Sequence, residues 1–104
     1  MIEKHFFNEW LMQDLEKLGY KKVVNKHGVV IYTKNDEDGF ITNIFSDKNN
    51  IYVSVGKKYS ENSVLGVRVY FENTDRFKLS LRNIKYVVGQ AKLEIESKIK
   101  EKSV

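Results

Sequence analysis

The sequence contains no cysteine and no proline. Without cysteine the chain has no disulfide, no thiolate nucleophile and no cysteine-ligated metal, and we expect it to work in the cytoplasm. The lack of proline is compatible with an uninterrupted sheet, because proline cannot donate a hydrogen bond to a neighbouring strand. The longest unbroken apolar run is Val29–Tyr32, whereas a helix that spans a bilayer needs about 20 residues. We therefore expect no membrane partner.

Length and charge set broad limits. A chain of 104 residues fits one domain, residues 1–104, and is long enough to fold without a metal or a disulfide. Lysine and arginine number 18 against 14 aspartates and glutamates, which gives a net charge of +4. This excess slightly favours an acidic partner such as nucleic acid, but no run of five like charges occurs.

A helix is expected at each end of the sequence. In residues 2–18, Phe7, Leu11, Leu15 and Leu18 recur at helical spacing, with Trp10 widening the apolar stripe, and Gly19 is a typical helix end. The second helix is expected from Asn83, a plausible N-cap, to Glu101. Its apolar stripe consists of Ile84, Val87, Val88, Ala91, Ile95 and Ile99.

Between the helices the apolar period changes to two, and turn residues recur at short intervals. The expected strands are Tyr20–Asn25, Gly28–Lys34, Phe40–Phe45, Ile51–Lys57, Leu65–Glu72 and Phe77–Leu81. A helix that began at Ser80 would replace the last of them, so the assignment of residues 77–82 stays open. Because all the connections are short, sequential strands should be neighbours. The fold class is therefore α+β: an N-terminal helix, a five- or six-stranded antiparallel meander and a C-terminal helix, with both helices on one face.

Two strands alternate cleanly enough to indicate that one face of the sheet is open to solvent. Val53 and Val67 belong to the aliphatic rows of these strands, whereas Tyr52, Arg68 and Tyr70 belong to the opposite rows. By the same parity argument we expect Tyr32 to join the two tyrosines on the open face. The strand Phe40–Phe45 is ambiguous, because both of its rows contain large apolar side chains.

The second helix carries a narrow patch opposite its main stripe, formed by Tyr86, Gly89 and Leu93. A glycine inside a helix costs about 1 kcal/mol relative to alanine, so it is often kept where another backbone approaches closely. The first helix is the expected neighbour of this patch, and a second chain is the alternative.

Residues that carry chemistry are few. His5 and His27 are the only histidines, and neither lies in a metal or catalytic-triad signature. The acidic segment Lys34–Phe45 has the spacing of a calcium loop around Gly39, but lysine and phenylalanine occupy its first and last ligand positions. We therefore expect an acidic turn there, and we predict no catalytic residue, no cofactor, no metal site and no enzymatic activity.

These patterns predict a small protein that binds another protein, in the manner of an inhibitor, immunity protein, adaptor or phage-encoded blocker. Binding would use the tyrosine-bearing sheet face or an exposed edge strand. The alternative is a nucleic-acid-binding protein, in which lysines and Arg68 meet phosphates while tyrosines stack on bases. A homodimer is a third option, and the sequence is assigned to no known family. The predicted partner-binding residues are Tyr32, Tyr52, Arg68, Tyr70, Lys57 and Lys58.

Overall fold

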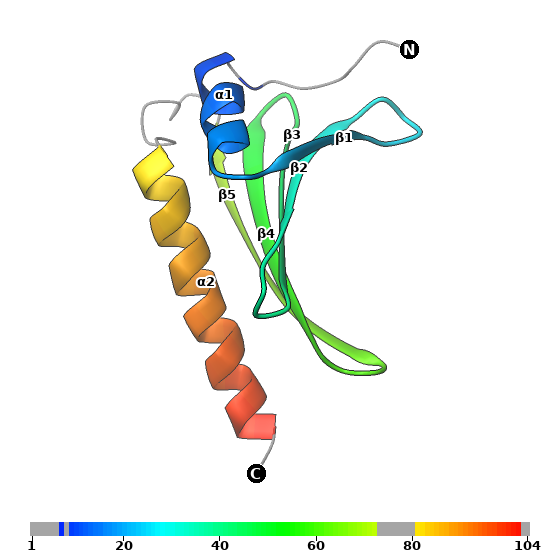
Figure 1. Cartoon of the computed structure of the whole chain (residues 1–104), viewed down its shortest axis with the longest axis vertical. Coiled ribbons are helices and arrows are strands. Elements are labelled where there is room, and N and C mark those ends of the chain that lie inside the picture. Colours follow the sequence, from blue (N-terminus) through cyan, green and yellow to red (C-terminus); the bar gives the residue numbers. More distant parts are fainter. Residues whose placement is uncertain (1–6, 8, 73–80, 103–104) are drawn as a thin grey trace.

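The computed structural model describes Phe7, residues 9–72 and residues 81–102. Helix α1 (Glu9–Lys17) precedes a five-stranded sheet, and helix α2 (Leu81–Lys102) follows it (Figure 1). The strands are β1 (Lys21–Val24), β2 (Val30–Asn35), β3 (Phe40–Ser46), β4 (Asn50–Ser60) and β5 (Ser63–Glu72). All neighbouring pairs are antiparallel, and the order in the sheet is β1-β2-β3-β4-β5. The predicted α+β meander is confirmed.

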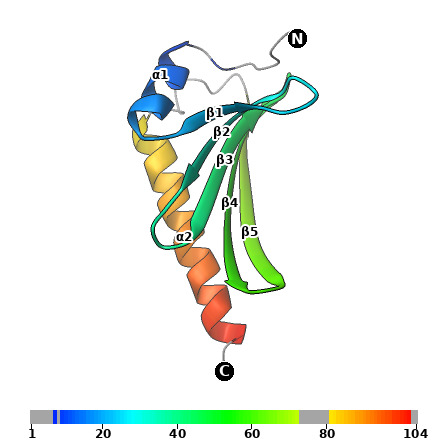
Figure 2. The same cartoon turned by 45° about the vertical axis from the view of Figure 1, so that its right-hand side comes forward.

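Both helices lie on the same side of the sheet, as predicted (Figures 1 and 2). Helix α2 runs along β4 and β5, and α1 packs near β1 and the start of α2. In the described part of the chain, neither helix is long and apolar enough to span a membrane. The sheet therefore has one face beneath the helices and one face that no described helix covers.

The covered face forms the core together with the two helices. Val53 and Val55 of β4 are fully buried, and Ile84 and Ile95 of α2 pack into the same cluster. Burying each such side chain contributes about 1.5 to 3 kcal/mol. From the N-terminal side the cluster is completed by Phe7, Leu11 and Leu15.

Helix α1 ends at the glycine that the sequence indicated. Gly19 has φ = +93°, a left-handed conformation that side chains with a Cβ rarely adopt. The backbone N–H of Tyr20 donates to the Leu15 carbonyl at 3.0 Å, which satisfies an otherwise unpaired acceptor of the last turn. This reversal turns the chain directly from α1 into β1.

Trp10 does not belong to the apolar stripe of α1, contrary to our expectation. Its side chain is 82% exposed, whereas Leu11 and Leu15 are buried. Trp10 and Leu15 lie about 140° apart on the helix circumference, at 100° per residue. A helix that rests on the sheet through Leu11 and Leu15 therefore turns Trp10 away.

Tyr32 lies beneath the helices, and its predicted place on the open face is wrong. Its side chain is only 1% exposed, and the edge of the Phe7 ring packs against it with centroids 5.6 Å apart. The cause is strand register: Tyr32 pairs with Ile44, which pairs with Val53. Residues directly opposite each other share a face, so Tyr32 belongs to the buried row of Val53.

The same register settles the ambiguous strand β3. Phe40, Thr42 and Ile44 are buried on the covered face, and Ile41 and Phe45 lie on the open face. The buried Thr42 forms a hydrogen bond with Tyr20, a side chain at the edge of the same core.

The hairpin that joins β4 to β5 is longer than predicted. The expected polar connection, Lys58–Ser63, is mostly strand, and only Glu61 and Asn62 form the turn. Polar side chains are tolerated here because the residues at this end of the hairpin are not buried. A register shift between Lys58 and Ser60 also interrupts the strict alternation of side chains. The predicted sixth strand lies outside the described residues, apart from Leu81, which belongs to α2.

Helix α1 does not cover the patch on α2. Tyr86 and Leu93 are 67% and 61% exposed, and an added Cβ on Gly89 would meet no atom within 4 Å. The side chains that α2 turns toward the sheet, such as Val88 and Ile95, point the other way around the helix. The patch is an exposed surface of α2 within the described part of the chain.

The contrasting positions of two tyrosines give a direct test of the register. Tyr32→Ala should lower the free energy of unfolding by about 3 to 5 kcal/mol, because it removes a buried ring. Tyr70→Ala should lower it by less than about 1 kcal/mol, because Tyr70 is 65% exposed. Urea unfolding followed by circular dichroism measures both values. Similar losses for the two variants would contradict the assigned faces.

Candidate functional site

One continuous row of apolar side chains crosses the open face from edge to edge. Strand register places Val23 opposite Ile31, Ile31 opposite Phe45, Phe45 opposite Tyr52, and Tyr52 opposite Tyr70. We call these five residues the tyrosine row. Each strand contributes one member, so the row exists only when the whole sheet has formed.

The aromatic members of the tyrosine row are in contact. The rings of Phe45 and Tyr52 stack with centroids 5.1 Å apart and planes 18° apart. The Tyr52 and Tyr70 rings follow at 6.4 Å, tilted by 47°. The guanidinium of Arg68 lies over the Phe45 ring, 5.4 Å from its centroid. Such contacts hold large side chains in place on a solvated sheet.

A polar row runs beside the tyrosine row. Its members pair in the order Lys21, Thr33, Asn43, Ser54 and Arg68. On the other side of this polar row, Gly56 and Gly66 face each other on β4 and β5. Because neither glycine has a side chain, Tyr52, Arg68 and Tyr70 stand above a low region of the surface.

Exposure along the tyrosine row is uneven. Tyr70 is 65% exposed and Val23 is 46% exposed, whereas the members between them are half-buried or better. A shallow hollow of about 250 Å³ is lined by Val23, Ile31, Thr33, Asn43 and Phe45. The open face therefore offers a hollow near one edge of the sheet and a protruding aromatic residue at the other.

The turn before β4 fixes the hydroxyl of Tyr52. This hydroxyl donates to Asp47 Oδ2 at 2.7 Å, while the backbone N–H groups of Asn49 and Asn50 donate to Asp47 Oδ1 at 2.8 and 2.7 Å. These hydrogen bonds, first that of the Tyr52 hydroxyl and then those of the two backbone N–H groups, lower the pKa of the Asp47 carboxyl below its ordinary value of 3.8. The Tyr52 side chain is thus held at its hydroxyl by Asp47 and at its ring by Phe45.

Comparison of the chain with protein-family models, curated proteins and solved structures found no match. The function must therefore be argued from the chemistry of the surface itself. Among the residues that the structure describes, no group of three or more histidine, aspartate or glutamate side chains is placed to hold a metal ion.

The six predicted partner-binding residues separate into three places. Tyr52, Arg68 and Tyr70 come together on the open face, and Tyr32 is buried. Lys57 lies on the covered side, where its ammonium group is 4.7 Å from the centroid of the Phe40 ring. The sequence predicted Lys57 as a partner-binding residue beside the tyrosines, but the structure places it on the other face, because Lys57 continues the buried parity of Val53 and Val55.

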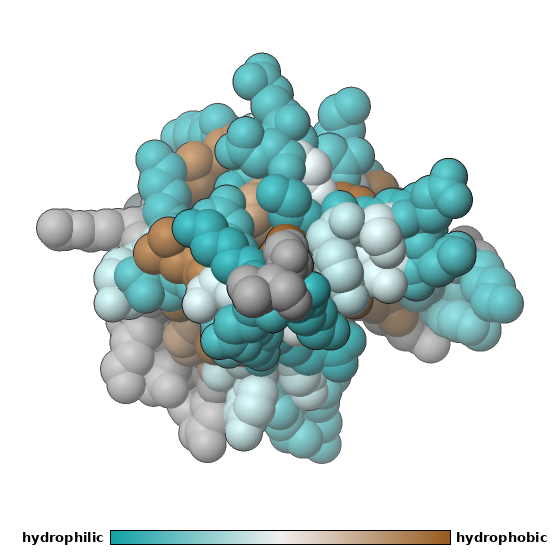
Figure 3. Space-filling view, turned by 90° about the horizontal axis from the view of Figure 1, so that it is seen from below, coloured by the Kyte–Doolittle hydropathy of each residue, from teal (hydrophilic) through white to brown (hydrophobic). Residues whose placement is uncertain are grey.

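Lys58 lies at the far end of β4, about 20 Å along the strand from Tyr52 at 3.3 Å per residue. Together with Lys57 it lines a hollow whose other walls are Tyr59, Glu96, Ile99 and Lys100. Figure 3 views the molecule from the end where α2 finishes, and hydrophilic side chains dominate the surface there. The two lysines therefore do not extend the tyrosine-bearing surface.

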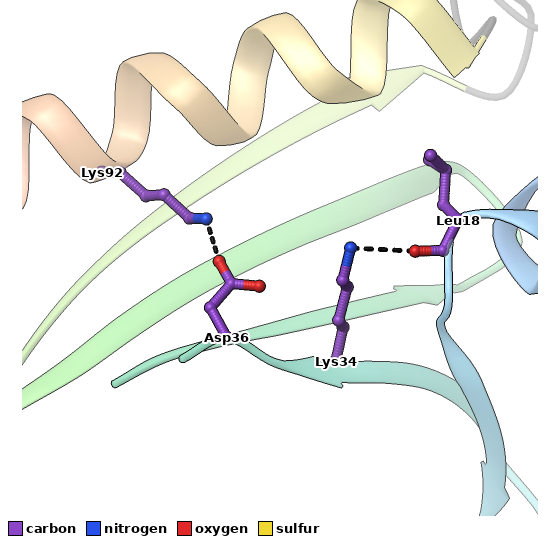
Figure 4. A network of polar contacts seen from close by, with 4 residues as sticks. All are labelled: Leu18, Lys34, Asp36 and Lys92. Carbon is purple, nitrogen blue, oxygen red and sulfur yellow. Dashed lines mark hydrogen bonds and ion pairs between the residues drawn. The ribbon is translucent and has the colours of Figure 1, made fainter. Parts of the chain in front are cut away.

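A third hollow lies between α2 and the covered face, and its polar groups stabilise the fold. Lys92 of α2 forms an ion pair with Asp36, and the Lys34 ammonium donates to the Leu18 carbonyl at 2.8 Å (Figure 4). Beside them, burial raises the pKa of Tyr20 above its ordinary value. The ion pair ties α2 to the turn after β2, and the Lys34 hydrogen bond ties β2 to the segment that follows α1. We assign this hollow no binding role.

Phe45, Ile31 and Val23 belong to the site but were not predicted. A usable signal for Phe45 exists in the sequence, because Asp47–Asn50 has the composition of a tight turn. If Ser46 and Ile51 flank that turn, as they do in the structure, Phe45 must face Tyr52. No comparable signal identifies Ile31 or Val23, since both rows of their strands contain apolar residues.

The link between Tyr52 and Asp47 can be tested by titration. Tyr52→Phe removes the hydrogen bond that contributes most to the lowered pKa, so the pKa of Asp47 should rise toward 3.8. It should stay below that value, because the two backbone donors remain. A carbon-detected NMR titration of the Asp47 side chain in both proteins measures the shift, and an unchanged pKa would contradict the assigned contact.

The same lowered pKa gives a direction for stability. A carboxyl whose pKa is lower when folded stabilises the protein above its unfolded pKa, and this contribution disappears as the pH falls through the folded value. The urea concentration at the midpoint of unfolding should therefore decrease as the pH is lowered below about 4. The share of this decrease that is due to Asp47 should be smaller in Tyr52→Phe.

Proposed function

We propose that this protein is a non-enzymatic binding module whose partner is another protein, and that the partner docks on the open face around Tyr52, Arg68 and Tyr70. The observation that carries the proposal is the tyrosine row: a contiguous set of aromatic and aliphatic side chains on a face that no described element covers. A role as an inhibitor, immunity protein, adaptor or blocker in the cytoplasm is consistent with this arrangement and with the lack of cysteine.

The chemistry of the face favours a protein partner. Tyrosine and arginine are the residues in which binding energy most often concentrates at protein interfaces, with a surrounding rim that excludes water. Tyr52 is held in place by Asp47 and Phe45, so a partner would lose little free energy in ordering it. The polar row beside the rings supplies hydroxyl and amide groups for specific hydrogen bonds.

Nucleic acid remains the second candidate, because stacked rings beside an arginine also suit exposed bases. Its phosphate contacts are poorer than the sequence predicted, since Lys57 lies on the opposite face and Lys58 lies far along β4. Along the polar row, the remaining cations are Lys21 and Arg68 at its two ends. We therefore favour a protein.

A pull-down with matched tyrosine variants tests the proposal. Tyr70→Ala should weaken recovery of the partner from a lysate of the source cells by about thirtyfold or more, the loss typical of a residue worth 2 kcal/mol at an interface. Tyr86→Ala is the control, because Tyr86 is equally exposed at 67% but lies on α2. Quantitative mass spectrometry of the bound fraction measures both.

Equal recovery of the same protein by the wild type and by a Tyr52→Ala, Tyr70→Ala double variant would exclude the open face. Fluorescence anisotropy with labelled single- and double-stranded oligonucleotides separates the second candidate. Tight binding that weakens steeply as salt rises would favour nucleic acid and overturn the assignment to a protein partner.

A further inference from the structure

The two edges of the sheet differ in a way that the open face does not explain. β1 is four residues long and carries Lys21 and Lys22, the short length and lysines by which natural sheets discourage pairing with another strand. β5 is ten residues long and contains neither lysine nor proline. Only one edge of this sheet is protected.

The unprotected edge is also apolar on both of its sides. Val64 and Tyr70 are 67% and 65% exposed on the open side, and Leu65 and Val67 are partly buried against the core on the other. β4 is the only strand among the described residues that pairs with β5. A long apolar edge of this kind is a template for another strand.

A second copy of the chain can pair with this edge only in certain registers. Two β5 strands related by a two-fold axis run antiparallel, and the axis keeps each side chain on its own face of the joined sheet. Two opposite residues must therefore both have even numbers or both have odd numbers. One residue of β5 then lies next to the axis, opposite the same residue of the second copy. The axis then passes through Val67 or through Arg68 if nearly the whole of β5 is to pair.

These two registers differ sharply in chemistry. With the axis at Arg68, the two guanidinium groups lie directly opposite each other, and like charges in that position are destabilising. With the axis at Val67, Tyr70 lies opposite the partner's Val64, and Leu65 lies opposite the partner's Val69. Tyr70 and Val64, the two most exposed apolar side chains of the edge, then form two contacts, one on each side of the axis.

We propose that the protein forms a homodimer through antiparallel β5–β5 pairing centred on Val67. The dimer is a continuous ten-stranded sheet, with the helices of both copies on one face and both open faces on the other. This inference goes beyond the proposed function and shares Tyr70 with it, because Tyr70 packs against the partner's Val64 in the dimer while Tyr52 and Arg68 stay on the open face. Its consequence for binding is that two surfaces built around Tyr52 and Arg68 lie side by side.

Cysteine cross-linking tests the register, because the chain has no cysteine of its own. Residues opposite each other at the axis have Cα atoms about 4.5 to 5.5 Å apart, within the range that a disulfide spans. Val67→Cys should therefore give a disulfide-linked dimer on mild oxidation with diamide. Two controls should remain largely single chains on non-reducing gels. One is an equimolar mixture of Leu65→Cys and Phe71→Cys, residues that lie opposite each other only when the axis passes through Arg68. The other is Leu93→Cys, at an exposed position of α2.

Sedimentation equilibrium tests the association itself. The unmodified protein should sediment at twice its chain mass of 12.2 kDa, and Val64→Glu should raise the dissociation constant at least tenfold without unfolding the chain, because Val64 is already exposed. Leu93→Glu is the matched control on α2 and should leave the dissociation constant unchanged.

A single-chain mass at all concentrations up to several hundred micromolar would overturn the dimer. Preferential cross-linking in the mixture of Leu65→Cys and Phe71→Cys would overturn the register, and equal cross-linking of Leu93→Cys would show that the disulfides form by random collision. Tyr52→Ala separates the dimer from the proposed function, because Tyr52 lies in β4 and outside the paired edge. A Tyr52→Ala variant that still sediments as a dimer but no longer recovers the partner protein would support both conclusions.

Discussion

The packing of α2 against β4 and β5 is the contact on which the other features of the molecule depend. Ile84 and Ile95 meet the buried row of Val53 and Val55 in one cluster, and this contact decides which face of the sheet is dry. Because side chains alternate along a strand, covering one row commits the other row to the open face. Tyr52, Arg68 and Tyr70 are exposed as a consequence of what the helix buries.

The open face is built to keep its aromatic side chains in place. Asp47 holds the hydroxyl of Tyr52, Phe45 holds its ring, and Arg68 lies over Phe45. Each of these contacts joins residues on different strands or on a strand and its turn, so the surface is ordered by the sheet and not by a covering element. A surface ordered in this way binds with a smaller entropic cost than one whose side chains are free to rotate.

The sheet also treats its two edges differently, and this asymmetry has a thermodynamic reason. An unpaired strand edge leaves backbone donors and acceptors to water, and the apolar side chains beside them gain from burial. At β1, Lys21 and Lys22 oppose that gain. At β5 no lysine opposes that gain, and Arg68 is the only positive charge of the strand.

The sequence by itself determined the element types, the order of the meander, the end of α1 at Gly19 and the outward direction of Tyr52 and Tyr70. These features follow from local conformational preference or from alternation within a single strand. The tertiary structure alone decided the burial of Tyr32, the membership of Ile31 and Val23 in the tyrosine row and the separation of Lys57 from the tyrosines. In β2 and β3 both rows are apolar, so which row is buried depends on the strand opposite, and that information lies in the register between strands and not in either strand alone.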